Sequence, residues 1–115
     1  MSTTEVERAR HALEKGAILR VLHDAYGGPA VMVSALAAVL DNLGYPMSQA
    51  NLQFSLAYLA DCEYARVVRA RDVPGFRRDR LRPGDSPETV VMVQLLPAGL
   101  RLLDGAEEED PQIRF

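Results

Sequence analysis

The 115-residue sequence contains a single cysteine, Cys62, so it cannot form an internal disulfide. No apolar stretch approaches the roughly 20 residues that span a bilayer, and the polar start of the chain does not resemble a secretory signal. These absences predict a cytoplasmic protein with one domain, held together by an apolar core rather than by covalent cross-links.

The chain also lacks the groups of residues that enzymes and metal sites need. His11 and His23 are isolated from each other and from Cys62, whereas a zinc site needs three or four converging ligands. The serines have no G-x-S-x-G elbow around them, and the glycines do not form a phosphate-binding P-loop. We therefore predict a protein that is not an enzyme and that needs no metal and no cofactor.

The chain does have a band of arginine. Residues 66–82 hold seven of the thirteen basic residues and two aspartates, a net charge of +5, although the whole chain carries −3. Such a patch is typical of nucleic-acid-binding proteins, and arginine suits bidentate contacts with phosphate. The predicted contacts to the DNA backbone are Arg66, Arg69, Arg71, Arg77, Arg78, Arg80 and Arg82. The alternative is a solvated loop whose arginines pair with Asp72, Asp79 and Asp85.

The hydrophobic periodicity predicts a mostly helical α+β domain. A helical pattern runs from the candidate N-cap Thr4 to Tyr26, and Gly16 within it indicates a break between an arm and a packed helix. Two more helices are predicted over residues 33–43 and 48–60, because Gly44 can end the first of them and Ser48 can cap the start of the second. Strands are predicted at 30–32, 65–71 and 88–95, a long loop at 72–87 and a short helix at 98–103.

Leucine-rich stripes on the second and third predicted helices indicate the core. The second helix places Leu36, Val39, Leu40 and Leu43 on one face, and the third repeats Leu52, Leu56 and Leu59. The predicted organisation is an N-terminal arm at 1–15, a domain at 16–104 and an acidic tail at 105–115, of which residues 107–111 are predicted to be mobile.

The order of these elements is that of a winged helix-turn-helix, with a small α+β domain unrelated to nucleic acid as the alternative. The chain resembles winged-helix regulators, and more closely the small winged-helix proteins of Mu-like bacteriophages and prophages. The resemblance lies in Leu36, Leu40, Leu43-Gly44, Met47-Ser48, Leu52, Leu56, Tyr58-Leu59, Val67-Val68, and the segments 93–103 and 110–114. It implies a winged helix-turn-helix fold with an antiparallel wing of two to three strands. This chain departs from the group in having a longer wing loop and no charged residues on the exposed face of its third helix.

In a winged helix the third helix enters the major groove, where Asn and Gln can read adenine through paired hydrogen bonds. The residues predicted to face bases or phosphates are Ser48, Gln49, Asn51, Gln53 and Ser55. The alternative is an ordinary surface helix, because polar residues opposite a leucine stripe are common on any amphipathic helix.

The N-terminal helix has apolar residues beyond those that fill the core. We predict a dimer interface at Val6, Ala9, Leu13 and Ala17, since a two-fold dimer would match a palindromic DNA site. The alternative is that this helix packs only on its own domain.

Together these patterns predict a homodimeric, sequence-specific protein that binds double-stranded DNA and regulates transcription, encoded in a phage or prophage. The alternative is a winged-helix module that binds another protein. The acidic remainder of the chain, the uncharged exposed face of the third helix and the acidic tail favour that alternative.

Overall fold

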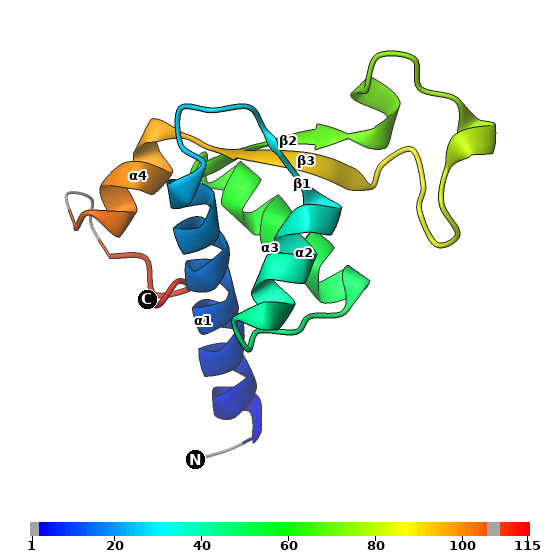
Figure 1. The fold of residues 1–115 in the computed structure, drawn as a ribbon. Helices are drawn as coiled ribbons and strands as arrows, with labels where there is room; N and C mark the ends of the chain where they lie inside the picture. Colours follow the sequence, from blue (N-terminus) through cyan, green and yellow to red (C-terminus); the bar gives the residue numbers. More distant parts are fainter. Residues whose placement is uncertain (1–2, 106–108) are drawn as a thin grey trace.

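The computed structural model describes residues 3–105 and 109–115, and over these residues the fold is α+β and mostly helical, as predicted (Figure 1). The helices are α1 (Thr3–Asp24), α2 (Val33–Asn42), α3 (Gln49–Asp61) and α4 (Pro97–Leu103). The strands are β1 (Val31–Met32), β2 (Ala65–Arg69) and β3 (Val90–Leu95). The elements follow one another in the predicted order.

The three strands form one antiparallel sheet in the order β1-β3-β2. Val93 in the middle of β3 pairs with Val31 of β1 on one side and with Val67 of β2 on the other. The first three helices lie on one side of this sheet, and the loop between β2 and β3 projects beyond them (Figure 1).

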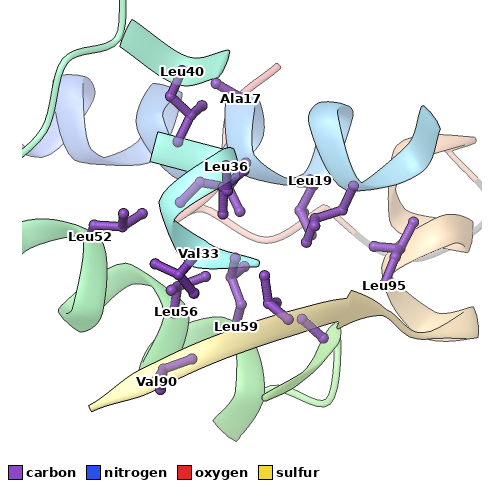
Figure 2. Close-up of a cluster of buried hydrophobic side chains, with 14 of the residues drawn as sticks. Ala17, Leu19, Val33, Leu36, Leu40, Leu52, Leu56, Leu59, Val90 and Leu95 are labelled. Carbon is purple, nitrogen blue, oxygen red and sulfur yellow. The ribbon is translucent and has the colours of Figure 1, made fainter. Parts of the chain in front are cut away.

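The core lies between the three long helices and the sheet (Figure 2). The predicted stripe of Leu52, Leu56 and Leu59 on α3 is fully buried. Burying one such leucine contributes about 1.5–3 kcal/mol. The prediction for α2 was partly wrong. Leu36 and Leu40 are buried, but Val39 and Leu43 are 42% and 58% exposed. The face of α2 that its neighbours cover is therefore narrower than the face on which these four apolar residues lie.

The connection between α2 and α3 follows the predicted capping chemistry. Gly44 has a φ of +89°, and the amides of Gly44 and Tyr45 donate back to the carbonyls of Asp41 and Leu40. This is the Schellman arrangement that ends a helix. Ser48 is the N-cap of α3, since its hydroxyl accepts a hydrogen bond of 3.1 Å from the amide of Asn51.

The predicted break at Gly16 was wrong, and so was the predicted N-cap at Thr4. Helix α1 begins at Thr3 and is continuous through Gly16 to Asp24. The glycine is there because the C-terminal segment crosses the helix at this point. A Cβ atom at Gly16 would lie 1.8 Å from the carbonyl oxygen of Arg114, which only glycine avoids.

The tail was predicted to be mobile over residues 107–111, but Asp110 within it is held by hydrogen bonds. The carboxylate of Asp110 accepts hydrogen bonds from the hydroxyls of Tyr58, at 2.9 and 3.0 Å, and Tyr64, at 3.2 Å. Ile113 is buried, and the amide of Arg114 donates to the carbonyl of Ala12. The tail therefore connects α1 to α3, while residues 106–108 lie outside the described residues.

Two titratable groups lie beside this tail. Burial raises the pKa of the Tyr58 hydroxyl, and its hydrogen bond to Asp110 raises that pKa further. Burial lowers the pKa of Lys15, whose Nζ lies 4.9 Å from the centroid of the Tyr58 ring. Both groups serve the docking of the tail and lie outside the arginine band.

Candidate nucleic-acid interface

Most of the arginine band lies on the segment between β2 and β3, residues 70–89, which we call the arginine loop. Strand β2 ends at Arg69, two residues before the predicted end, where the pairing with β3 shifts register between Val68 and Arg69. The loop contains Pro74, Pro83 and Pro87, which have no amide to donate to a sheet. It is therefore a projecting irregular segment with two short 3₁₀ turns rather than a longer hairpin.

Three of the seven arginines have partners within the molecule. Arg71 pairs with the carboxylate of Glu88, and Arg77 with that of Asp79 at 3.2 Å. Arg69 donates to the backbone carbonyl of Glu88 at 2.8 Å. Both ion pairs are exposed, and exposed pairs stabilise a protein by only about 0–1 kcal/mol. A phosphate could therefore compete for these guanidinium groups.

The other four arginines have no carboxylate partner among the described residues: Arg66, Arg78, Arg80 and Arg82. All four are exposed. Of the acidic residues predicted as partners, Asp79 pairs with Arg77, whereas Asp85 accepts a hydrogen bond from Gln49 instead. Of the two ion pairs that the described arginines of the band make, one uses a predicted partner, Asp79, and the other uses Glu88.

The arginine loop lies beside the N-terminal end of α3. The side-chain amide of Gln49, the first residue of α3, donates to Asp85 of the loop at 3.1 Å. Ser48 and Asn51 are exposed at the same end of the helix. The start of α3 and part of the arginine band therefore share one region of the surface.

Two residues predicted to read bases are not available for that role. Ser55 is 1% exposed, because it lies three residues after Leu52 and four before Leu59 and so belongs to the buried stripe. Gln53 is bound to the backbone of β3: its amide nitrogen donates to the carbonyl of Val90 at 2.9 Å, and its amide oxygen accepts from the amide of Val90 at 2.8 Å. We remove both residues from the candidate interface.

The contacts of Gln53 lead to a prediction about stability. In Gln53→Ala, both backbone groups of Val90 lose a half-buried partner, so we expect a loss of about 1–3 kcal/mol in the free energy of unfolding. Urea unfolding followed by circular dichroism measures this loss. The matched control Asn51→Ala, on the exposed side of the same helix, should change stability by less than about 0.5 kcal/mol. Equal losses in the two variants would contradict a bridging role for Gln53.

Phe54 is a surface feature to which the sequence analysis gave no role. It is 71% exposed, one turn after the exposed Ala50 on α3. The signal was its phase, since Phe54 lies two residues from both Leu52 and Leu56 and therefore away from their buried stripe. An exposed aromatic ring on this helix can contact a thymine methyl group or an apolar protein surface.

The predicted dimer residues separate into two groups. Ala17 belongs to the buried core, so this assignment was wrong. Val6 and Leu13 are exposed and Ala9 is half-buried. These three line a surface groove of about 370 Å³ between α1 and the turn at Gly44-Tyr45.

The described residues contain no cluster of three His, Cys, Asp or Glu side chains that could hold a metal ion. None of the described helices is both long enough and apolar enough to cross a membrane. Comparisons with protein-family models, curated proteins and solved structures gave no match for this chain.

Proposed function

We propose that this protein is a winged helix-turn-helix protein that binds double-stranded DNA through α3 and the arginine loop and thereby regulates transcription. The observation that carries the proposal is the set of four arginines on β2 and the loop that have no carboxylate partner among the described residues, with that loop joined to the start of α3 by the Gln49–Asp85 hydrogen bond. The helix order and the β1-β3-β2 sheet are compatible with this fold.

The two parts of this surface have different tasks in the proposal. The start of α3 offers Ser48 and Asn51 to the major groove, where an amide side chain such as that of Asn51 pairs with adenine, while the amide of Gln49 holds the loop beside the helix. Helix α3 has no Lys or Arg, so the phosphate contacts that supply most of the affinity come from the arginines of the loop and of β2.

Salt dependence tests the proposal. Each phosphate contact changes the slope of log affinity against log salt by about −0.9, so four contacts predict a slope between about −3 and −4. The measurement is the binding of the full chain to a fluorescently labelled mixed-sequence duplex by anisotropy at several salt concentrations. No binding to any duplex at low salt would contradict the proposal.

The groove at Val6, Ala9 and Leu13 supports a homodimer as part of this proposal. Leu13→Asp places a charge on an apolar contact, so we expect the variant to sediment as a monomer and to lose preference for palindromic over single half-sites. Val39→Asp is the matched control, because Val39 is 42% exposed, Leu13 is 39% exposed, and Val39 lies outside the groove. A native chain that is monomeric at micromolar concentrations would contradict this part.

A second candidate function is a module that binds another protein, and Phe54 favours it. A large ring that is 71% exposed at the middle of a helix without basic residues is typical of an interface anchor. The two functions differ in their response to Phe54→Ser. A protein interface should lose most of its affinity, whereas DNA binding that depends on phosphate contacts should keep its salt slope.

A further inference from the structure

A cavity of about 610 Å³ separates the arginine loop from the body of the molecule. Its walls come from the start of α2, the start of α3, the outer end of β3 and both sides of the loop. Figure 1 shows the loop extending away from the helices at this end of the sheet. The volume lies within the range of about 300–1,000 Å³ that small-molecule sites occupy.

Most of the cavity wall is apolar, and its apolar residues come both from the arginine loop and from the body of the molecule. Its apolar side chains include Met32, Val33, Ala37, Phe76, Leu81 and Val91. Met32 is more than half exposed, and Phe76 and Leu81 are half-buried although they belong to a polar loop. Phe76 therefore lines this cavity rather than the surface of the molecule. An open apolar wall of this kind gains free energy when an apolar group covers it.

The charged groups that line the cavity are mainly positive. Arg77, Arg80 and Arg82 contribute to its lining, and Arg80 and Arg82 have no carboxylate partner in the described part of the chain. The acidic residue in the lining is Asp85, whose carboxylate accepts the hydrogen bond from Gln49. An anionic group at this position would meet two guanidinium groups that do not have to give up an existing ion pair.

We propose that this cavity binds a small amphipathic anion, a molecule with an apolar body and one carboxylate, sulfonate or phosphate. The body covers the wall formed by Phe76, Leu81 and Val91, and the anionic group accepts charge-assisted hydrogen bonds from Arg80 and Arg82. Such a ligand contacts both the arginine loop and the start of α3. This site is additional to the proposed DNA-binding function and does not rest on it.

Anilinonaphthalene sulfonate is a suitable probe, because it combines an apolar ring system with one sulfonate and fluoresces when the rings leave water. Its uncharged analogue, phenylnaphthylamine, has the same rings without the anion. We expect the full chain to bind the sulfonate more tightly than the analogue. In the variant Arg80→Gln with Arg82→Gln, affinity for the sulfonate should fall about tenfold, and affinity for the analogue should stay within about twofold of the native chain.

A matched control comes from a second groove that has two arginines in its lining. Arg20 and Arg114 lie there with Phe115 and Leu43, so Arg20→Gln with Arg114→Gln removes the same charge beside a different apolar surface. This control should change the affinity for the sulfonate by less than about twofold.

Three results would overturn the proposal. One is a larger loss of sulfonate binding in the Arg20 and Arg114 control than in the Arg80 and Arg82 variant. Another is an equal loss in both, which would indicate attraction by overall charge. The third is equal affinity of the native chain for the two probes. None of these results involves DNA, so a failure of this site and a failure of the proposed function are distinguishable.

Discussion

Substitution of Gly16 by alanine is expected to lower the free energy of unfolding by about 1.5–3 kcal/mol, although alanine is the better helix former by about 1 kcal/mol. The reason is the crossing tail, because the new Cβ would lie 1.8 Å from the carbonyl oxygen of Arg114. The tail must detach, which exposes Ile113, a loss of about 1.5–3 kcal/mol. It also breaks the hydrogen bond from the Arg114 amide to Ala12, a loss of about 1 kcal/mol.

The control for this prediction is the same substitution in a chain whose tail is already released. Ile113→Asp places a charge in the buried position of Ile113 and should undock the tail. In that background Gly16→Ala should no longer destabilise the chain and should stabilise it by up to about 1 kcal/mol. Urea unfolding of the four proteins gives the comparison. A loss of the same size in both backgrounds would mean that Gly16 acts within α1 alone.

Replacement of the four unpartnered arginines by glutamine is expected to reduce affinity for duplex DNA by a hundredfold to about a thousandfold at low salt. The variant carries Arg66→Gln, Arg78→Gln, Arg80→Gln and Arg82→Gln. The magnitude of its salt slope should fall by up to about 0.9 for each phosphate that is no longer neutralised. All four side chains are exposed, so stability should stay within about 0.5 kcal/mol of the native chain.

A control that removes the same number of charges distinguishes binding at a specific face from attraction by the overall charge of the protein. Glutamine at Arg8, Arg10, Arg20 and Arg114 removes the same charge from α1 and the tail, away from the arginine loop. Screening limits charge effects to about 10 Å at moderate salt, so this control should keep most of the native salt slope. Equal effects of the two variants would contradict a binding face at the loop.

The fold could be predicted from the sequence where local chemistry decides it. The leucine stripe of α3, the Schellman glycine Gly44 and the N-cap Ser48 depend on spacing or on backbone conformation within a few residues. The predicted buried stripe of α2 included too many residues, because the width of the face that is buried depends on the elements packed against the helix. The sequence showed that Val39 and Leu43 are apolar but not that about half of each would stay exposed.

The tail could not be predicted because its stability comes from interactions between distant residues. Asp110 lies 52 residues from Tyr58 in the sequence, and nothing in an acidic segment indicates that a carboxylate will meet two tyrosine hydroxyls. The role of Gly16 also depends on a segment that is distant in the sequence. A glycine within a helical pattern indicates a weak point, unless a partner segment approaches so closely that only glycine fits.

The charge of the candidate site could be predicted from the sequence, but its geometry could be predicted only in part. The arginine band is a property of composition and could be read directly from the sequence. The burial of Ser55 could have been predicted, since it shares a helix face with Leu52 and Leu59. The binding of Gln53 to the backbone of Val90 could not, because that interaction spans 37 residues between α3 and β3.

The most direct test of the proposed DNA-binding face is a titration of the isotope-labelled chain with a duplex, followed by the NMR shifts of its backbone amides. We predict that the amides of residues 48–51 at the start of α3 and of residues 77–82 in the arginine loop shift together. The amides around Val6 and Phe115 should not follow them at the same duplex concentrations. Shifts confined to α1 and the tail, or none in residues 77–82, would contradict the proposed interface.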